Sequence, residues 1–300
     1  MEEHGAKGLA TTWLGKPIAG YLGGRDNNLN LIRIVAASAV LISHAFALTT
    51  GDELSEPFRA STGLSLGQFA VAIFFGISGL LIARSFDRKP SFAHFFSARF
   101  LRLWPALAVV LLLTAFAVGP VMTSLPVGEY LASGQTLAYV PRNLSLAFRY
   151  DYLPGVFTQN PYGAATNGSL WSLFYEVACY GGVVFAGYLG ALRNGRRFAL
   201  FLMLVIAGYG WSVIAEPEGG LAYRIDIMGF VSFPFVLGML AYVWREHFRL
   251  GLAGIVLSWS LVASLWGTVW LASTIMMALI YTSLWLAFVP KGAALADVLP

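Results

Sequence analysis

Long apolar windows are the feature that most restricts the fold of this chain. Windows of roughly 17 to 23 residues recur along it, each long enough to cross a hydrocarbon core about 30 Å thick as a helix. Eight such spans are predicted: 29–48, 64–83, 103–122, 169–191, 198–215, 228–244, 250–266 and 269–289. Because unpaired backbone groups are costly in hydrocarbon, the sequence predicts an all-α fold, a polytopic transmembrane helical bundle of about eight helices.

Composition excludes an ordinary soluble domain. The 300-residue chain is 58% hydrophobic and only 11% charged, whereas soluble domains carry about 25% charged residues. Residues 1–28 are expected to form a polar cytoplasmic segment without a removable signal peptide. Residues 29–300 then form one transmembrane domain with a long extracytoplasmic loop at 123–168. The expected environment is a lipid bilayer, and no nucleic-acid partner is expected.

Basic residues give the orientation. With the N-terminus inside, the inner segments hold fourteen of the nineteen Lys and Arg residues, the outer segments hold four, and Arg33 lies within the first span. The positive-inside rule therefore places both termini in the cytoplasm. The expected location is an inner (plasma) membrane of bacterial type. Anionic lipid alone is sufficient to explain most of these basic connecting segments.

Ionisable side chains inside the predicted spans are the first candidates for function, since such groups are costly in hydrocarbon. Arg33 and His44 are eleven residues apart, so they share one side of the first helix, roughly 16 Å apart along its axis. Glu176 in the fourth span is predicted roughly 10 Å below the outer surface, near the depth of His44. A carboxylate paired with His44 would orient the imidazole as a general base for a hydroxyl.

The residues alone leave structural alternatives open. His44 can hydrogen-bond to a neighbouring helix, Glu176 can bridge two helices as a protonated acid, and Arg33 can extend its guanidinium toward headgroups. On the helix of Glu176, Ser169, Ser172 and Tyr180 continue a polar stripe at helical spacing. That stripe is consistent with the wall of a cavity.

Two further groups of residues suggest ligand binding. Arg99 and Arg102 stand at i and i+3, a spacing that suits a phosphate clamp for a polyphosphorylated cytosolic donor and a lipid headgroup equally well. Small residues around Ser78, in the segment 75–79, either admit a slender ligand or allow two helices to approach closely. The sequence contains no P-loop, dinucleotide fingerprint or Cys/His cluster with metal spacing, so no metal is expected.

The predicted outer loop combines prolines and aromatic residues with polar side chains that include Asn167. Loops this long are usually functional or disordered. Aromatic faces beside amides suit a sugar-binding surface, and Asn167 is therefore a candidate contact for an acceptor. An aromatic belt at the membrane interface explains many of the same residues.

Four motifs, in order, resemble the acyltransferase-3 family of integral membrane O-acyltransferases. They lie between residues 27 and 180, and the rest of the chain agrees in hydropathy. The motifs are Asn27-Asn28-Leu29-Asn30-Leu31-Ile32-Arg33 through Leu41-Ile42-Ser43-His44, Ile73-Phe74-Phe75-Gly76-Ile77-Ser78-Gly79-Leu80-Leu81, Arg99-Phe100-Leu101-Arg102-Leu103-Trp104-Pro105-Ala106, and Asn167-Gly168-Ser169-Leu170-Trp171-Ser172-Leu173 leading to Glu176.

The resemblance implies an inner-membrane enzyme that moves an acyl group, such as acetyl, from acyl-coenzyme A onto a hydroxyl of a cell-surface or exported glycan or a lipid-linked saccharide. It implies no permanently bound cofactor. His44 and Glu176 would be catalytic. The residues implied to contact the donor are Arg33, Ser78, Arg99 and Arg102, and those implied to contact the acceptor are Asn167 and Trp171.

The chain departs from the family pattern in two places. Asn30 stands where relatives usually carry an acidic residue, and the chain ends at Pro300, where the family normally continues, so a C-terminally short member is expected. The alternative function is a multispan transporter or flippase of a glycan or lipid-linked precursor, in which Arg33, His44 and Glu176 line a path. A third is a member that only scaffolds glycan assembly.

Overall fold

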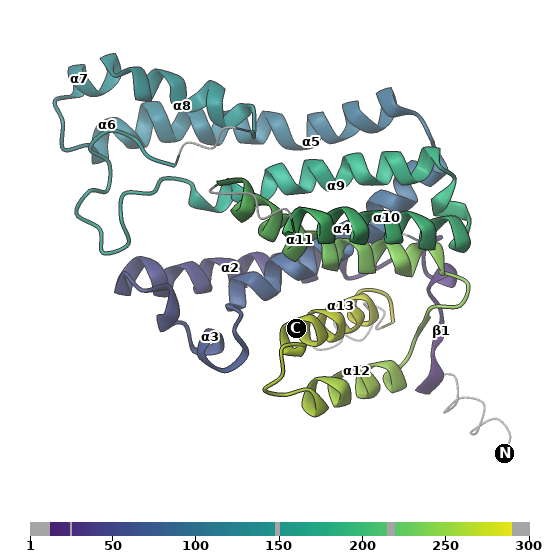
Figure 1. The fold of residues 1–300 in the computed structure, drawn as a ribbon. Coiled ribbons are helices and arrows are strands. Elements are labelled where there is room, and N and C mark those ends of the chain that lie inside the picture. The colour runs from purple at the N-terminus through teal and green to yellow at the C-terminus, as the bar shows by residue number, and fades with distance from the viewer. Residues whose placement is uncertain (1–12, 25, 148–150, 215–219, 290–300) are drawn as a thin grey trace, which may run out of the picture. The chain divides into compact units, whose positions relative to one another are not determined.

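The structure is a computed structural model that describes residues 13–24, 26–147, 151–214 and 220–289, with only the backbone described at 212–214 and 220–222. A helix accounts for most of each predicted span (Figure 1). These helices are α2 (Leu29–Thr50), α4 (Leu66–Arg88), α5 (Phe92–Leu113), α9 (Trp171–Tyr188), α10 (Gly195–Ile214), α11 (Gly220–Val243), α12 (Leu252–Ser264) and α13 (Leu271–Phe288). Within the described residues, six spans are long and apolar enough to cross a membrane. The chain is a multi-pass, all-α membrane protein.

The third span differs from the prediction at its N-terminal end. Helix α5 begins at Phe92 rather than Leu103, and the helical path continues through η3 (Thr114–Val118) and α6 (Gly119–Met122). The side chain of Ser91 caps the start by accepting a hydrogen bond from the backbone N–H of His94. The hydropathy pattern missed this start because the first turns carry basic side chains, which can extend toward the membrane surface. Arg99 and Arg102, the predicted phosphate clamp, therefore lie inside the span.

The predicted outer loop at 123–168 is partly helical. It contains α7 (Val127–Ala132) and α8 (Gly134–Leu144). The side chain of Ser133 accepts a hydrogen bond from Gln135 N at 3.2 Å and caps α8. Tyr139 of α8 is fully buried, in an apolar cluster that this segment shares with α5 and η3. The seventh span is also shorter than expected, since α12 has 13 residues.

The described helices group into two compact units. Unit 1 comprises residues 1–43, 56–88 and 183–300, and unit 2 comprises residues 44–55 and 89–182. Helices α2 and α9 each contribute residues to both units. The predicted boundary after residue 28 stays a prediction.

Helices α4 and α11 form the closest helix pair in unit 1, and glycines make that approach possible. A Cβ placed on Gly79 of α4 would overlap the carbonyl oxygen of Phe235 of α11. A Cβ on Gly238 of α11 would overlap the carbonyl oxygen of Gly76 in return. The small residues of segment 75–79 therefore serve close packing, as in other small-residue membrane interfaces. Helix α11 continues through Pro234 without a break.

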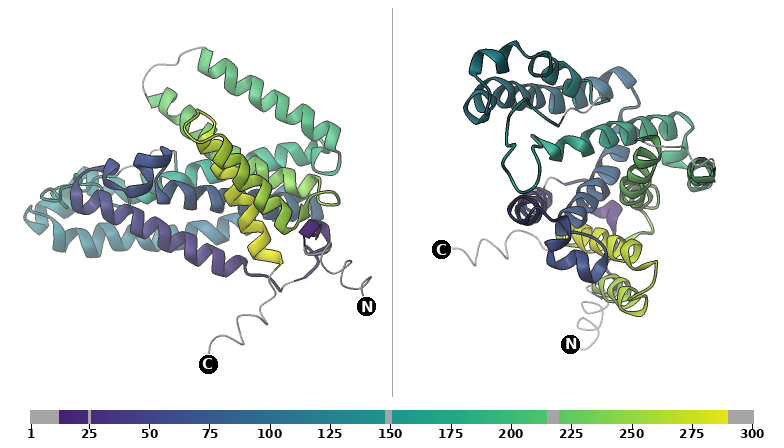
Figure 2. Two further views of the ribbon diagram at one scale, coloured as in Figure 1. Left: turned by 90° about the horizontal axis from the view of Figure 1, so that it is seen from below. Right: turned by 60° about the vertical axis from the view of Figure 1, so that its left-hand side comes forward.

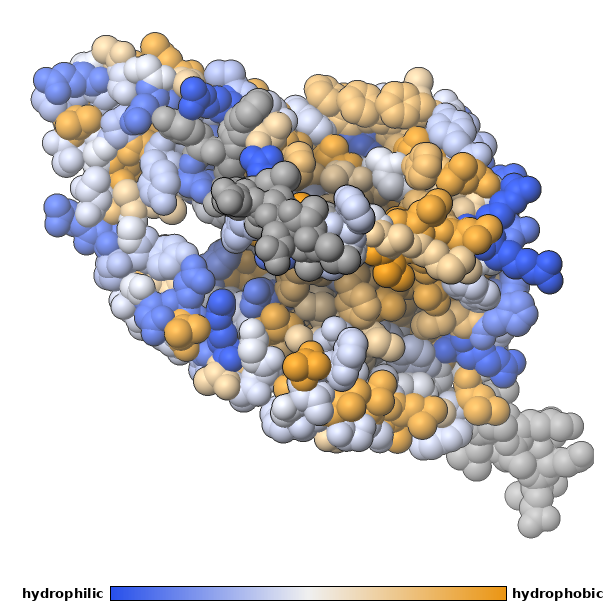
Figure 3. Space-filling view, in the orientation of Figure 1, coloured by the Kyte–Doolittle hydropathy of each residue, from blue (hydrophilic) through white to orange (hydrophobic). Residues whose placement is uncertain are grey.

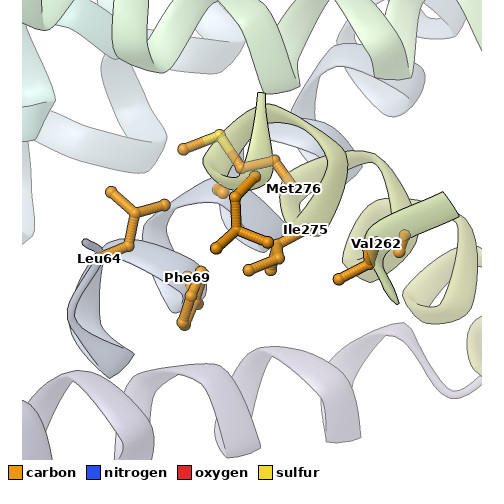
Figure 4. Close-up of a cluster of buried hydrophobic side chains, with 8 residues drawn as sticks. Leu64, Phe69, Val262, Ile275 and Met276 are labelled. Carbon is orange, nitrogen blue, oxygen red and sulfur yellow. The ribbon is translucent and has the colours of Figure 1, made fainter. Parts of the chain in front are cut away.

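The remaining core of unit 1 lies where α4 meets α12 and α13. Helices α12 and α13 run side by side in both views of Figure 2. Figure 4 shows part of the apolar cluster that joins them to the start of α4. Its buried members are Leu64, Phe69, Ala72, Val262, Leu271, Ile275, Met276 and Ala278. These contacts hold α13 against the face of α4 that carries Gly76, whose position faces Ile280.

Segments predicted on the inner side meet at one end of unit 1. Strand β1 (Lys16–Pro17) pairs antiparallel with β2 (Arg249–Leu250), and Asn28 N donates to the carbonyl of Ala287 at 2.8 Å. Hydrophilic side chains gather at this end, at the right-hand edge of Figure 3. The meeting of these segments agrees with the predicted alternation of the spans. Which side of the membrane this end occupies stays a prediction.

Asp87 stabilises the same end through an ion pair with Arg193 and a hydrogen bond from the buried hydroxyl of Tyr242. Asp87 at the end of α4 accepts hydrogen bonds from Arg193 Nε at 2.5 Å and from the hydroxyl of Tyr242 at 2.6 Å. The hydrogen bond to Asp87 raises the pKa of Arg193. Since Arg193 is largely exposed, the buried hydroxyl of Tyr242 gains more from Asp87 than the arginine does.

Unit 2 is built around α5 and α8, which pack together beside η3 and α7 (Figure 1). Its core contains Leu107, Leu111, Ala115, Tyr130, Tyr139, Leu153 and Val156. The indole N–H of Trp104 donates to the carbonyl of Leu144 at 3.1 Å. The predicted outer segment is thus fixed along the third span from Trp104 to Ala115.

Candidate active site

Helix α2 carries both Arg33 and His44, as the sequence predicts. Each side chain is half-buried, and a regular helix places them on one side. Ser43 is buried beside Gly67 of α4, where an added Cβ would lie 2.9 Å from the serine hydroxyl. Arg33 belongs to unit 1, whereas His44 belongs to unit 2. The pairing of His44 with Glu176 stays a prediction.

The end of α2 lies against the loop that leads to Asn167. The hydroxyl of Tyr162 donates to the carboxylate of Glu53, which follows α2 in η2 (Glu53–Ser55). A Cβ on Gly51 would come within 2.8 Å of the carbonyl oxygen of Pro161. Less than two helical turns separate His44 from Gly51. His44 and the predicted acceptor segment are therefore at the same end of unit 2.

Asn167 is fixed by a hydrogen-bond network of its own. It sits in the left-handed backbone region with φ 57°, just before η4 (Gly168–Leu170). Its side-chain nitrogen donates to the hydroxyl of Thr114 at 2.8 Å and to that of Tyr139 at 3.0 Å. Both amide hydrogens are thus used within the protein. The carbonyl oxygen is the atom of this side chain that suits an acceptor hydroxyl.

The partners of Asn167 come from a distorted part of the third span. Thr114 begins the π-helical turn η3, a feature found often at functional sites. The hydroxyl of Tyr130 donates to the carbonyl of Ala115 in the same turn at 2.7 Å. Burial raises the pKa of Tyr139, so its phenol is neutral at physiological pH. This network was not predicted, because its members are far apart in sequence.

Glu176 on α9 is held by a tyrosine one turn away. The hydroxyl of Tyr180 donates to Oε1 of Glu176. Tyr180 is buried, and its ring packs edge-on against Phe95 of α5 with the ring centroids 6.2 Å apart. The guanidinium of Arg99 lies 5.2 Å from the centroid of the Phe95 ring. The charges of Glu176 and Arg99 are close enough to act on each other.

The two clamp arginines occupy different environments. Arg99 is half-buried and faces the group formed by Phe95, Tyr180 and Glu176, whereas Arg102 is exposed. Arg102 also acts electrostatically on Arg99. Both arginines also act electrostatically on Tyr180, so α5 places two cations near the hydroxyl that holds the acid, one half-buried and one exposed. Their predicted role as a phosphate clamp stays a prediction.

The other predicted residues lie apart from this group or at its edge. Trp171 begins α9, half-buried, with its ring edge-on to Tyr175 at 6.0 Å between centroids. Ser78 is half-buried on α4 in unit 1. The described residues include no group of three or more His, Cys, Asp or Glu that could hold a metal ion.

These features define a multi-pass helical membrane protein with an acid, a tyrosine and an arginine gathered on two spans. Residues 26–296 match the family model described as an acyltransferase domain. The chain belongs to the acyltransferase-3 family.

Two curated proteins resemble the chain. It is 33% identical over 183 residues to an O-acetyl transferase of Shigella phage Sf6, covering 61% of this chain and 52% of that protein. It is 31% identical over 265 residues to nodulation protein 10 of Rhizobium leguminosarum bv. viciae, covering 84% of this chain and 68% of that protein. The first match thus spans about half the length of the relative. No solved structure matches significantly.

Proposed function

We propose that this protein is a membrane O-acyltransferase that moves an acyl group, acetyl in the first instance, from acyl-coenzyme A to a hydroxyl of a cell-surface or exported glycan. The observation that carries the proposal is the group of Glu176, Tyr180 and Arg99 within two spans of an acyltransferase-3 family member. A relative named O-acetyl transferase supports acetyl as the acyl group. Family membership also favours group transfer over the alternative of transport.

In the proposed reaction, the acceptor hydroxyl oxygen attacks the thioester carbonyl of the donor. His44 takes the hydroxyl proton as general base, and Glu176 orients its imidazole. The new C–O bond forms, the C–S bond breaks, and the departing thiolate takes the proton from His44 to leave as coenzyme A. Positioning such a base typically contributes roughly 10²- to 10⁴-fold in rate.

The donor and the acceptor approach from opposite ends of α5 in this proposal. Arg99 and Arg102, on the inner part of the helix, hold the phosphates of a cytosolic donor, and the pantetheine arm extends outward past Arg33 and Ser78. The acceptor lies near Asn167 and Trp171, at the end of unit 2 where α2 meets the loop. The proposal assigns the protein to an inner membrane with a cytoplasmic N-terminus.

The test is the O-acetylation of surface polysaccharide in cells with the protein, without it, and with His44→Ala. We expect mass spectrometry to show one acyl group per modified residue only with the unsubstituted protein. His247→Ala is the matched control, because His247 is an exposed histidine outside the proposed site. Undiminished acylation by His44→Ala at normal membrane abundance would contradict the proposed chemistry.

A further inference from the structure

Four aromatic side chains form a continuous ladder along α5. Phe92, Phe96, Phe100 and Trp104 follow one another at i+4 spacing, with ring centroids 5.8, 6.0 and 5.0 Å apart. Successive rings are nearly parallel, with interplanar angles of 16°, 27° and 20°. The three phenylalanines are 56%, 50% and 40% exposed. The ladder thus presents flat aromatic surface at the inner end of the third span.

Packing within unit 2 does not account for the inner end of the ladder. The aromatic residue that α5 uses against α9 is Phe95, which is buried, whereas Phe92 and Phe96 are exposed. An interfacial belt is usually made of Trp and Tyr, whose polar atoms reach the headgroups. Exposed phenylalanines in register are a poor match to that pattern.

The charges around the ladder favour an anionic occupant. Arg99 and Arg102 follow Phe96 on α5, Arg88 and Lys89 precede the helix, and α5 contains no Asp or Glu. The acid nearest in sequence, Asp87, is engaged by Arg193 and Tyr242. Glu176, the acid that acts on Arg99, accepts a hydrogen bond from Tyr180. A flat apolar surface directly beside several cations suits a nucleotide, because the base stacks on aromatic faces while the phosphates pair with arginine.

We infer that Phe92 and Phe96 form a stacking surface for the adenine ring of the acyl donor, next to arginines that receive its phosphates. This inference rests on the proposed function, since it names where the nucleotide of acyl-coenzyme A binds. Phe96 and Arg99 are separated by about 4.5 Å along the helix axis, a spacing a ribose between base and diphosphate can bridge. Because α5 runs outward from Phe92, the acyl end of a donor bound this way points toward the outer half of unit 2.

The test is binding to the purified full chain in detergent of three probes: coenzyme A, adenosine 3′,5′-bisphosphate and phosphopantetheine. The double variant Phe92→Leu/Phe96→Leu keeps apolar bulk but removes the aromatic faces. We expect it to weaken binding of the two adenine-containing probes by about 5- to 150-fold, the usual range for one stacked base. Phosphopantetheine affinity should be unchanged. Phe92→Tyr/Phe96→Tyr should retain the affinity for coenzyme A.

The matched control is Phe116→Leu, which changes a phenylalanine of similar exposure in η3, far from the inner end of the span. Equal coenzyme A affinity in the Leu double variant and the control would overturn the inference and leave the proposed function standing. Loss of bound phosphatidylglycerol from the double variant, with coenzyme A affinity unchanged, would identify the ladder as a lipid surface and also overturn it. No coenzyme A binding by the unsubstituted protein would overturn the proposed donor, and the stacking surface with it.

Discussion

Tyr180 donates a hydrogen bond to Glu176 from one turn further along α9. This bond fixes the direction of a carboxylate in a membrane span, and the packing of Tyr180 against Phe95 fixes the donor in turn. Tyr180 is therefore a positioning residue for the acid that we propose orients His44.

Tyr180→Phe should lower the turnover number for acyl transfer while leaving the KM for the donor nearly unchanged. The ring still packs against Phe95, and the loss is the hydrogen bond to the acid. Hydrogen bonds to charged groups contribute about 1.5–3 kcal/mol, which corresponds to about a 10- to 150-fold fall in rate. Steady-state kinetics of the purified protein measures it. Tyr188→Phe, an exposed tyrosine on the same helix, is the control, and equal effects of the two variants would contradict the positioning role.

Arg102→Ala should weaken donor binding without affecting folding, because Arg102 is exposed. The expected loss in coenzyme A affinity is about 10- to 150-fold if the guanidinium pairs with phosphate. Arg102→Lys should recover part of it, since lysine keeps the charge but loses the two-pronged geometry. Isothermal titration in detergent checks this order. Unchanged affinity in Arg102→Ala would remove this residue from the donor site.

Hydropathy was sufficient to predict a helix in each of the eight spans and the order of these helices, but six helices of the described residues are long and apolar enough to cross a membrane and α12 has only 13 residues. Helical periodicity placed Arg33 with His44, and the i+4 spacing of Glu176 and Tyr180 already indicated that these side chains could meet. The start of α5 was missed because its first turns contain cations and a histidine, which resemble a connecting segment. Hydropathy in particular reports transfer into lipid and carries little information on residues whose charged ends reach the surface.

The network around Asn167 was beyond prediction for a different reason. Asn167 is 53 residues from Thr114 and 28 from Tyr139 along the chain. The sequence pattern gives no pairing between such distant residues, and the π-helical turn that presents Thr114 has no local signature. Asn167 was predicted to contact the acceptor, and the structure adds that its amide hydrogens are already engaged.

Asn167→Ala should destabilise the protein by about 2–5 kcal/mol. It removes two hydrogen bonds, and it replaces asparagine, which tolerates the left-handed conformation, with alanine, which disfavours it. Asn167→Gly keeps that conformation accessible and should cost less, about 1–3 kcal/mol for the hydrogen bonds alone. Thermal unfolding in detergent measures the order. Asn160→Ala, an exposed asparagine of the same loop, should leave the unfolding temperature unchanged. Equal loss in the Ala and Gly variants would show that backbone conformation contributes nothing.

Gly79→Ala tests the closest helix contact in unit 1. The added methyl group would overlap the carbonyl oxygen of Phe235, a backbone atom that cannot move without displacing α11. Overpacking usually costs about 1–3 kcal/mol, so we expect a lower unfolding temperature. Gly208→Ala on α10 is the control, because a Cβ there has no neighbour within 4 Å. That substitution should be neutral or stabilising, since alanine favours a helix over glycine. A Gly79→Ala protein as stable as Gly208→Ala would mean that α4 and α11 are not in contact at Gly79.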